Sequence, residues 1–339
     1  MTAYQRLQEE LRAEPRTWLV TGVAGFIGSH LLEALLRFGQ TVVGLDNFST
    51  GSPRNLDDVR RRVTDEAWAR FTFHQGTVLD IGPCREASNR VDYVLHHAGF
   101  VSVPLSIEDP IGCHDANVTG TLNLLIAARD NRVRRVVFAS SSAVYGDDER
   151  LPKIETQVGR PLSPYAASKT MSEIQARLCH DLYGLETIGL RYFNVFGPRQ
   201  NPRGGYAAVI PHWIVALLAG RECVIHGDGA ITRDFCYVAD IVQANLLAAI
   251  TRERSAPGEV FNVGLGAQTT LDQLYAMLAA RVAALTGAPV RPVTHGPPRP
   301  GDIRHSGADI GKITRTLGFC PEANLESAVV ETVQWFATA

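Results

Sequence analysis

The fold prediction starts from Val20-Thr21-Gly22-Val23-Ala24-Gly25-Phe26-Ile27-Gly28-Ser29-His30. The apolar run at 18–20 predicts a buried strand, and the apolar residues after Gly25 recur at the spacing of a helix. The three glycines therefore fall on the turn that joins a strand to a helix. Residues without a Cβ let the backbone bend sharply at such a turn and let the helix pack closely on the strand.

The same turn predicts a site for a dinucleotide. The free N–H groups and the positive dipole end of the helix favour a pyrophosphate. A second apolar run at 41–45 predicts a strand that ends on Asp46, where a carboxylate binds ribose hydroxyls and repels a 2′-phosphate. We therefore expect NAD as the cofactor. The alternative, a tight turn without a ligand, is disfavoured by the strand and the acid that follow.

Composition argues against several classes of protein. The 339 residues suffice for about two domains, and 45% of them are hydrophobic and 20% charged, as in globular proteins. The net charge of −2 offers no electrostatic basis for binding nucleic acid or an anionic membrane. No run reaches the roughly 18 apolar residues of a membrane span, and the first residues lack the apolar core of a signal peptide.

The cysteines are scattered without CxxC spacing, which argues against a zinc site and against a disulfide framework. There are six of them: Cys84, Cys113, Cys179, Cys223, Cys236 and Cys320. We expect reduced thiols, no bound metal and a cytoplasmic protein.

Strands and helices are expected to alternate through the first half of the chain. Further strands are predicted at 71–75, 93–96, 135–139 and 187–193, and helices at 56–68, 115–130 and 164–183. This alternation predicts an α/β fold with a doubly wound parallel sheet, the Rossmann architecture. Near the amino end, Tyr4, Leu7 and Leu11 predict a short amphipathic helix that rests on the body and ends before Pro15.

The pattern changes beyond Asn194, where prolines and glycines interrupt it. Helices are predicted there at 207–219, 239–251, 271–285, 309–317 and 325–336. We expect a smaller α/β substrate-binding lobe interleaved with late elements of the sheet. The predicted division is an extension at 1–16, a NAD-binding domain at 17–195 to which 235–264 returns, and a lobe at 196–234 and 265–339.

Two features follow the strand predicted at 93–96. His96 and His97 are adjacent, and since neighbouring residues of a strand point to opposite faces, we interpret both as structural. The small residues Ala98 and Gly99 leave room for a cofactor across the strand end.

The chemistry is predicted from Tyr165 and Lys169, which lie one turn apart at the start of a helix and so share a face. An ammonium beside a phenol lowers the pKa of the phenol from about 10, so that the phenolate can take a proton from a sugar hydroxyl while hydride leaves the same carbon. Ser141 or Ser142, at the tip of the strand at 135–139, can hydrogen-bond the reacting oxygen. The alternative is a surface pair of the kind that any helix carries.

These motifs carry a family resemblance over nearly the whole chain. The glycine triad, Ser140-Ser141-Ser142-x-x-Tyr145-Gly146 and Tyr165-x-x-x-Lys169 resemble the extended short-chain dehydrogenase/reductases. Further motifs narrow the resemblance to nucleotide-sugar 4-epimerases: Arg191-Tyr192-Phe193-Asn194, Gly227-Asp228-Gly229 with Arg233-Asp234-Phe235, and Arg299-Pro300-Gly301-Asp302. Together with the N-terminal extension, Leu45-Asp46-Asn47-Phe48 and Tyr206-Ala207-Ala208-Val209-Ile210-Pro211, they make the chain most similar to UDP-N-acetylglucosamine 4-epimerases of polysaccharide pathways.

The resemblance implies three sets of site residues and no metal ligand. The catalytic residues are Ser141, Ser142, Tyr165 and Lys169. The residues around NAD are Gly22, Gly25, Phe26, Ile27, Gly28, Asp46, Asn47, Ser49, Thr50, Gly51, Thr77, Val78, Ala98, Gly99, Asn117, Tyr165 and Lys169. The residues around a UDP-sugar are Ser102, Ser142, Asn194, Val209, Val224, His226, Arg233, Arg299, Asp302 and Ser306, with ordinary surface charge as the alternative for the two arginines.

Three departures from the family pattern bear on specificity. Gly76-Thr77-Val78 stands where the family has Gly-Asp-Ile or Gly-Asp-Val, which puts the adenine contact of that acid in doubt. Ser142-Ala143 stands where dehydratase relatives have Asp–Glu, so we do not expect water elimination. Ser306 aligns with a bulky tyrosine of epimerases restricted to glucose and galactose, so the resemblance implies room for an acetamide beside the sugar C2.

The implied reaction is oxidation and re-reduction at C4 of a UDP-N-acetylhexosamine, with UDP-glucose and UDP-galactose as further substrates. A UDP-hexuronic acid 4-epimerase or decarboxylase remains an alternative, although Val101 and Ser102 add no cation for a sugar carboxylate. A non-catalytic NAD-binding regulator is the alternative of another class. The resemblance also implies a homodimer formed through the helices at 118–130 and 164–183.

Overall fold

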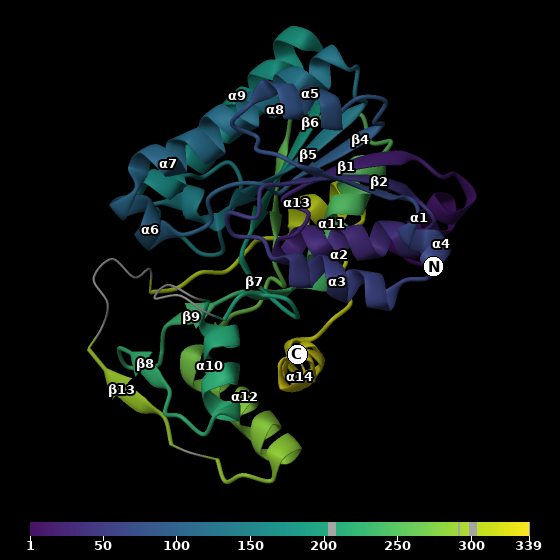
Figure 1. Ribbon diagram of the computed structural model, residues 1–339. Helices are drawn as coiled ribbons and strands as arrows, with labels where there is room; N and C mark the ends of the chain where they lie inside the picture. Colours follow the sequence, from purple (N-terminus) through teal and green to yellow (C-terminus); the bar gives the residue numbers. More distant parts are fainter. Residues whose placement is uncertain (203–207, 291, 298–303, 339) are drawn as a thin grey trace.

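The computed structural model describes residues 1–202, 208–290, 292–297 and 304–338 (Figure 1). Its centre is a seven-stranded sheet in which every pair of neighbours is parallel. In spatial order the strands are β11 (Val260–Val263), β6 (Glu186–Tyr192), β5 (Arg135–Ser141), β4 (Tyr93–His96), β1 (Thr17–Thr21), β2 (Thr41–Asp46) and β3 (Phe71–Gln75). The chain winds outward from β1 in both directions, which confirms the predicted doubly wound fold.

Alternate residues of each inner strand enter two separate hydrophobic cores. In β1, Trp18 and Val20 face one core, whereas Leu19 faces the other, as the pleat of a strand requires. The first core includes residues of α2 (Phe26–Arg37), α3 (Pro53–Arg62), α11 (Val238–Ile250) and α13 (Gly311–Leu317). The second core includes residues of α5 (Ile81–Ala87), α8 (Gly120–Asp130) and α9 (Pro164–Tyr183). Helices therefore cover both faces of the sheet.

The predicted N-terminal helix is α1 (Ala3–Ala13), and it packs against α11. Its first turn is closed by a capping box between Thr2 and Gln5. Tyr4, Leu7 and Leu11 are buried in the first core, one helical turn apart. The extension is thus part of the body of the protein.

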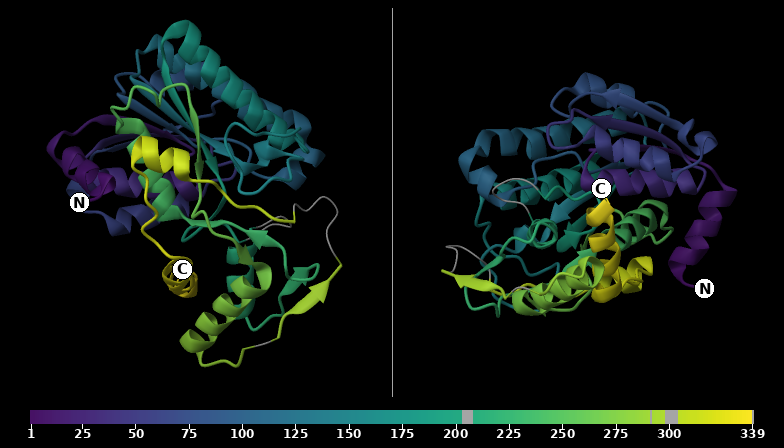
Figure 2. Two further views of the ribbon diagram at one scale, coloured as in Figure 1. Left: turned by 180° about the vertical axis from the view of Figure 1, so that it is seen from behind. Right: turned by 60° about the horizontal axis from the view of Figure 1, so that its bottom comes forward.

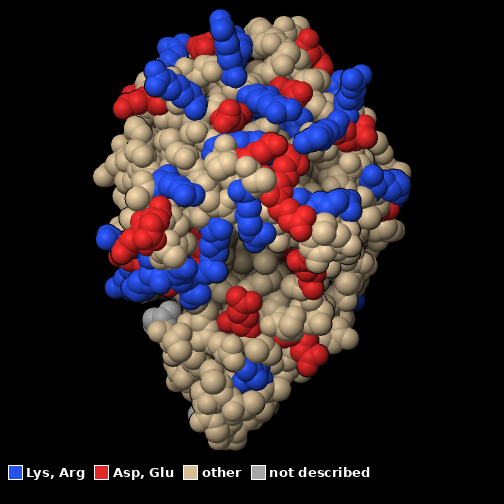
Figure 3. Space-filling model, turned by 90° about the vertical axis from the view of Figure 1, so that its right-hand side faces the viewer, with Lys and Arg blue, Asp and Glu red and all other residues tan. Residues whose placement is uncertain are grey.

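A smaller lobe begins where β6 ends and the chain continues into β7 (Asn194–Phe196) (Figures 1 and 2). It has a third hydrophobic core, built by α10 (Val209–Leu218), α12 (Leu271–Thr286), α14 (Leu325–Thr338) and β10 (Phe235–Tyr237). Three two-stranded sheets complete it: β7 with β10, β9 (Thr232–Arg233) with β12 (Thr269–Thr270), and β8 (Val224–His226) with β13 (Thr294–Gly296). On the face shown in Figure 3, charged side chains crowd the upper part of the molecule, and the lower part is mostly uncharged.

Phe26 and Ile27, at the start of α2, pack against the core of this lobe. The segment between α13 and α14 is fixed to α11, because both ends of the Gln243 amide bond the backbone of Cys320 at 2.9 Å. The lobe is therefore attached to the sheet at the glycine turn and at the link before α14.

Two helix predictions are corrected. The helix expected at 56–68 begins at Pro53 and is divided into α3 and α4 (Asp65–Trp68), because Thr64 caps a new helix with a bond from Ala67 N to its Oγ1 (3.2 Å). The helix expected at 115–130 is preceded by α6 (Val103–Glu108) and α7 (Pro110–His114), and its first turn, 115–119, is a π-helix. Proline in the first turn of α6 and of α7 favours these separate starts.

All six cysteines are free thiols, and Cys320 alone among them is exposed. None of the described helices combines the length and the apolar character needed to cross a membrane. Within the same described ranges, no three histidine, cysteine or acidic side chains gather in a way that could hold a metal ion.

Candidate active site

The glycine turn between β1 and α2 is too crowded for side chains. Gly22 has φ +66°, and a Cβ there would lie 2.8 Å from the His97 carbonyl. A Cβ on Gly28 would lie 2.0 Å from the Gly22 carbonyl oxygen. Gly25 caps α2 and donates its N–H to the same oxygen at 3.0 Å. Only glycine therefore fits at Gly22 and Gly28 in the turn that leads into the amino end of α2.

Asp46 joins the end of β2 to this turn. One carboxylate oxygen accepts the N–H of Ala24 at 2.9 Å, and the other accepts the N–H of Phe48 at 2.7 Å. The following loop folds back on the turn, since Ser52 donates its N–H to the Ala24 carbonyl at 2.9 Å. Asn47, Ser49 and Thr50 are exposed on that loop, and a Cβ on Gly51 would lie 3.0 Å from both Asp46 oxygens. The structure therefore gathers these predicted residues around one carboxylate.

Thr77 and Val78 lie in the turn after β3. The Thr77 hydroxyl accepts the N–H of Leu79 at 3.2 Å and so stabilises its own turn. Val78 is buried in the core under α8, and its carbonyl accepts Asn123 Nδ2 at 3.0 Å. The side chain of Val78 thus packs inward, and the partly exposed Thr77 is the one beside the surface.

His96 and His97 point to opposite sides, as expected for neighbours at a strand end. Thr21 Oγ1 accepts the N–H groups of His97 (3.2 Å) and Ala98 (3.1 Å), so its own proton goes to His96 Nδ1 at 2.7 Å. Burial, followed by the charge of Lys169, lowers the pKa of His96 to about 3, so its ring is neutral. His97 Nε2 lies 2.9 Å from the Tyr192 hydroxyl. Thr21 thereby fixes residues 97–98 over Gly22.

Asn117 holds the loop that follows β4. Its Oδ1 accepts the N–H of Phe100 at 2.8 Å, and its Nδ2 donates to the Phe100 carbonyl at 3.1 Å and to Ser168 Oγ at 2.9 Å. A Cβ on Gly99 would lie 2.5 Å from the Asn117 oxygen. The buried amide therefore positions the loop beside α9.

Tyr165, Lys169 and Ser141 meet at the carboxyl end of β5. Helix α9 begins sharply, because Ser163 Oγ accepts the N–H of Ala166 at 3.1 Å and Pro164 is its first residue. The Lys169 ammonium lies 5.8 Å from the centre of the Tyr165 ring and donates to the Ala139 carbonyl at 2.9 Å. Ser141 ends β5 and its Oγ accepts the N–H of Ala143 at 3.1 Å, while Ser142 begins the 3₁₀ turn that follows.

The pKa of Tyr165 differs from the expectation. Burial raises the pKa of the phenol, and the nearby Ser141 hydroxyl acts in the lowering direction. Burial is the largest influence, so the lowering expected from Lys169 is not observed. Burial also lowers the pKa of Lys169 to about 8, against a raising influence of Cys113 and Glu173.

A buried polar network supports this corner from behind. Arg191 of β6 donates from Nε and Nη2 to both oxygens of Glu173, at 2.9 and 2.8 Å, and Ser140 also donates to Glu173. Arg191 Nη1 donates to the Tyr145 hydroxyl at 3.2 Å, which in turn donates to Asn262 Oδ1 at 2.6 Å. The network fixes α9 against β5 and hence Tyr165 against Ser141.

The lobe places a second group of predicted residues around β7 and β9. Asn194 is exposed at the start of β7, and its N–H donates to the carbonyl of Asp234 at 3.0 Å. Arg233 ends β9, with Nη1 2.9 Å from the Thr232 carbonyl. The buried Asp234 accepts the N–H groups of Leu265, Gly266 and Ala308, so it fixes this strand next to Arg233.

Ser306 lies beside β9, because its N–H donates to the Thr232 carbonyl at 3.2 Å. Two residues later, Ala308 packs with Val144 and Tyr145, which follow Ser141 and Ser142 in the chain. The segment with Ser306 is thus packed against the turn that carries Ser141 and Ser142.

The remaining predicted residues are spread over the lobe and its surroundings. Val209 begins α10 and is partly buried. Val224 is exposed on β8, and His226 Nδ1 lies 3.1 Å from the Pro297 carbonyl oxygen. Ser102 caps α6 through a bond from Leu105 N at 3.3 Å. Arg299 and Asp302 lie outside the described residues.

The site thus combines the glycine turn between β1 and α2 with Tyr165, Lys169 and Ser141 at the end of β5. A comparison with protein families agrees with a site of this kind. Residues 18–264 match the model of the NAD dependent epimerase/dehydratase family. The chain belongs to this family.

Known members of the family are similar over almost their whole length. A UDP-glucose 4-epimerase of Mycolicibacterium smegmatis is 38% identical, with 94% of this chain and 97% of the relative aligned. The solved UDP-N-acetylglucosamine 4-epimerase of Methanobrevibacter ruminantium, in complex with UDP-N-acetylmuramic acid, is 37% identical with a TM-score of 0.86 and covers 96% of this chain and 99% of its own. The UDP-glucose 4-epimerase of Thermus thermophilus, solved with NAD, is 34% identical with a TM-score of 0.81, covering 94% and 98%.

The residues present fit the NAD of the family. The glycine turn lies at the amino end of α2, which favours a pyrophosphate, and Asp46 provides a buried carboxylate beside it. Some supporting residues were not predicted: Thr21, Glu173, Arg191 as a partner of Glu173, and Asp234 as an anchor. Glu173 had a signal in the sequence, because it continues the one-turn spacing of Tyr165 and Lys169. The others depend on contacts between distant segments.

Proposed function

We propose that this protein is an NAD-dependent UDP-N-acetylglucosamine 4-epimerase that interconverts UDP-GlcNAc and UDP-GalNAc, with UDP-glucose and UDP-galactose as secondary substrates. The observation that carries the proposal is the convergence of Tyr165, Lys169 and Ser141 at the carboxyl end of β5. The N-acetyl preference rests on the small Ser306 and on likeness to the solved UDP-N-acetylglucosamine 4-epimerase.

In this proposal the cofactor lies along the carboxyl edge of the sheet. Gly22, Gly25, Phe26, Ile27 and Gly28 would hold the pyrophosphate at the amino end of α2, where the helix dipole favours it. Asp46 would accept the hydroxyls of the adenosine ribose, with 47–51 and Thr77 at the adenosine. Lys169, together with the loop of Ala98 and Gly99 that Asn117 positions, would hold the nicotinamide ribose. When bound, NAD supplies a hydride acceptor at C4 and then returns the hydride.

The lobe would anchor the UDP group. Asn194 and Arg233 lie on neighbouring segments, and a guanidinium suits the diphosphate. Val209, Val224 and His226 would flank the uracil, and Ser102 and Ser306 the sugar. Arg299 would pair with the diphosphate and Asp302 would accept from the uridine ribose. Residues 17–195 with 235–264 then serve the cofactor, and 196–234 with 265–339 serve the substrate, except that α13 packs in the core of the sheet domain and β10 in that of the lobe.

The chain's own residues move one proton. Tyr165 as phenolate takes the proton of the C4 hydroxyl as the C–H bond of C4 breaks, which leaves a 4-keto sugar. Ser141, with Ser142 beside it, hydrogen-bonds the reacting oxygen, and Lys169 stabilises the phenolate by its charge. The sugar turns about its UDP anchor and presents the other face of C4, and Tyr165 returns the proton to the C4 oxygen as C4 regains its hydrogen on that face. C4 is inverted without a net redox change.

A substitution at the base tests the reaction. Tyr165→Phe removes the proton acceptor, so turnover should fall by about 10²–10⁴-fold while the bound nucleotide, extracted and identified by chromatography, stays NAD. Tyr183→Phe, at the exposed end of the same helix, is the matched control. Near-normal turnover of Tyr165→Phe would contradict the role given to this residue.

A second substitution tests the sugar. Ser306→Tyr should abolish turnover of UDP-N-acetylglucosamine and preserve that of UDP-glucose, because the larger ring would occupy the space beside C2. Initial rates on both substrates, separated by chromatography, give the answer. Equal turnover of both sugars by the variant would refute this argument.

The alternative within the family is action on a UDP-hexuronic acid. Curated relatives include a UDP-glucuronate 4-epimerase of Thermodesulfobacterium geofontis, 31% identical, and a UDP-N-acetyl-alpha-D-glucosaminuronate decarboxylase of Bacillus cytotoxicus, 33% identical. The exposed Val101 and the Ser102 cap supply no positive charge for a carboxylate in this loop. The same substrate panel, extended to UDP-glucuronate, separates the two. Bound NAD without turnover of any sugar would favour a regulator.

We also propose a homodimer formed through α8 and α9, and a cytoplasmic location consistent with six free thiols. Met171, Ile174, Leu178 and Leu182 are exposed along α9 at spacings of three and four residues. Such a stripe on a long helix suits packing against a second copy of itself.

A further inference from the structure

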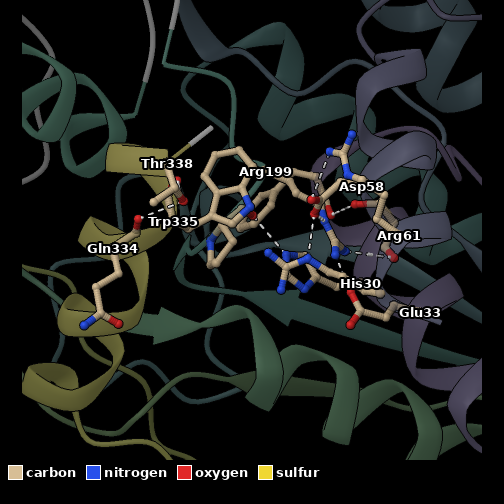
Figure 4. Close-up of polar contacts among 12 residues, drawn as sticks. His30, Glu33, Asp58, Arg61, Arg199, Gln334, Trp335 and Thr338 are labelled. Atoms are coloured by element: carbon tan, nitrogen blue, oxygen red, sulfur yellow. Dashed lines mark hydrogen bonds and ion pairs between the residues drawn. The ribbon is translucent and has the colours of Figure 1, made fainter.

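Arg199 is a buried arginine between the lobe and the sheet domain, in the turn after β7. Its backbone has φ +65°, and its side chain is 1% exposed. The guanidinium forms ion pairs with Glu33 of α2 and with Asp58 of α3, the latter with Nε 2.7 Å from Oδ2. A third bond runs from Nη1 to the Ser29 carbonyl at 3.3 Å (Figure 4). One side chain thus joins the turn to two helices.

His30 of α2 provides a second tie to the same turn. Its Nε2 lies 2.9 Å from the Pro198 carbonyl oxygen, which can only accept a hydrogen bond. Burial, followed by the charge of Arg199, lowers the pKa of His30 to about 3, so the ring is neutral and carries its proton on Nε2. Figure 4 shows His30 and Arg199 beside one another, between α2 and the turn.

The joined elements serve the two halves of the proposed site. Helix α2 begins at the glycine turn, and α3 follows the loop that folds over Asp46. On the other side, β7 starts with Asn194 and pairs with β10, which follows Arg233 in the chain. Phe196 of β7 belongs to the core of the lobe. A shift at Arg199 would therefore move the UDP anchor relative to the cofactor turn.

Stability alone does not require charges at this place. A buried arginine with two carboxylates is expensive to desolvate, and well-packed neutral replacements of such groups are often no less stable, whereas removing one partner is strongly destabilising. An arginine with two carboxylates does have one property that apolar packing lacks, namely a fixed direction and distance for each bond.

We propose that Arg199 is a positioning residue that sets the placement of the substrate lobe against α2 and α3. Its effect on turnover rests on the proposed epimerase function, because only a reaction between two bound ligands depends on the distance between their sites. A displacement of about 1 Å can cost on the order of 100-fold in rate.

The test compares a variant that loses only the arginine with a variant in which all three charged side chains are replaced by neutral ones. Arg199→Met alone removes the buried cation between Glu33 and Asp58 and leaves these carboxylates only their pairs with the more exposed Arg37, Arg61 and Arg62, so the midpoint of thermal unfolding should fall by about 4–7 °C. In the triple variant Glu33→Gln, Asp58→Asn and Arg199→Met, the midpoint should return to within about 3 °C of the original. Its kcat on UDP-N-acetylglucosamine should nevertheless stay at least about tenfold lower, with the affinity for UDP alone, measured by calorimetry, changed by less than about threefold.

A matched control is Arg135→Met. Arg135 is equally buried and paired with Glu186 at 2.5 Å, but it lies at the amino end of β5, away from the cofactor turn. This variant should lose stability without loss of kcat at a temperature where it remains folded. Original kcat in the triple variant with its midpoint restored would overturn the proposal.

Hydrogen exchange provides a readout that does not need turnover. Bound UDP should protect amides of α2 and α3 in the unmodified protein, because Arg199 joins them to the lobe, and in the triple variant protection should be confined to the lobe. If no UDP-sugar is converted by the unmodified protein, the proposed function fails while this measurement still decides the role of Arg199. Equal protection of α2 and α3 in both proteins would overturn that role.

Discussion

Lys169 shows how burial adjusts a single residue to a task. Its ammonium is surrounded by β5 and α9, bonded to the Ala139 carbonyl and near Gly99. The cost of keeping a charge there lowers the pKa of Lys169 from 10.5 to about 8. The residue is therefore mostly charged at neutral pH, but it loses its charge around pH 8, where enzyme activity is readily measured.

This pKa predicts a falling limb in the pH profile. If the charge of Lys169 stabilises the Tyr165 phenolate, kcat/KM on the preferred UDP-sugar should decline above about pH 8, by up to tenfold per pH unit. Lys169→Arg keeps a charge at all these pH values, so its lower activity should show no such decline. A profile of the unmodified protein that stays flat to pH 10 would contradict this role.

The stability contributed by the same residue should change in the opposite direction. The pKa of Lys169 is lower in the folded protein than in the unfolded chain, so the unfolded chain binds more protons between pH 8 and 10.5. The contribution of Lys169 to the free energy of unfolding therefore rises with pH in this window. A loss of activity there cannot be attributed to deprotonation of Lys169 unfolding the protein.

At the scale of elements, α9 has one face that carries Tyr165 and Lys169 and another that is exposed. Tyr165, Lys169 and Glu173 lie one turn apart on the side that meets β5 and β6. The apolar stripe that includes Ile174 and Leu178 lies on an exposed side of the same helix. In the proposed dimer, packing against a second copy would cover the stripe and support the helix that positions Tyr165 and Lys169.

The dimer can be tested by charge. The double variant Ile174→Asp with Leu178→Asp should be a monomer where the unmodified protein is a dimer, because carboxylates buried in the interface would be desolvated without a partner. Light scattering after size-exclusion chromatography measures the mass. Leu285→Asp, an equally exposed leucine on α12, is the control and should not change the mass. A dimer that persists in the double variant would place the interface elsewhere.

The same elements show what the sequence could predict. Helix α9 has a serine cap, a first-turn proline and a glycine after its last turn, all of them local signals, and its bounds match the expected 164–183. The helices α6 and α7 were missed because their apolar residues are exposed and leave no buried periodicity. Tyr165 and Lys169 could be found by spacing, whereas Asp234 bonds backbone groups of 265, 266 and 308, a connection that no local pattern records.

At the scale of the whole molecule, three histidines, one buried and two partly buried, are held in neutral form. Burial lowers the pKa of His30, His96 and His97 to about 3 each. They titrate near 6.5 in the unfolded chain, so the unfolded chain binds more protons below that pH and stability falls on acidification. Asp240 acts in the opposite direction between pH 6 and 3.8, because burial raises its pKa to about 6.

Acidification should therefore destabilise the protein at pH values well above those at which ordinary carboxylates titrate. With three histidines opposed by one aspartate, the free energy of unfolding should fall by roughly 2–3 kcal/mol between pH 6 and pH 5, measured by urea denaturation. His30→Gln should reduce this slope by about one proton, and the exposed His114→Gln controls for the substitution itself. An unchanged free energy between these two pH values would contradict the assignment.

Cys320 carries the one exposed thiol among the six cysteines, and this has a practical consequence. It sits in the link between α13, which packs with the sheet, and α14, which packs with the lobe, while the other five thiols are enclosed. A maleimide dye would react at this joint without any prior removal of cysteines, and its emission would change if the two halves rotate when a nucleotide arrives. The native chain thus carries its own labelling point at the joint between the sheet and the lobe.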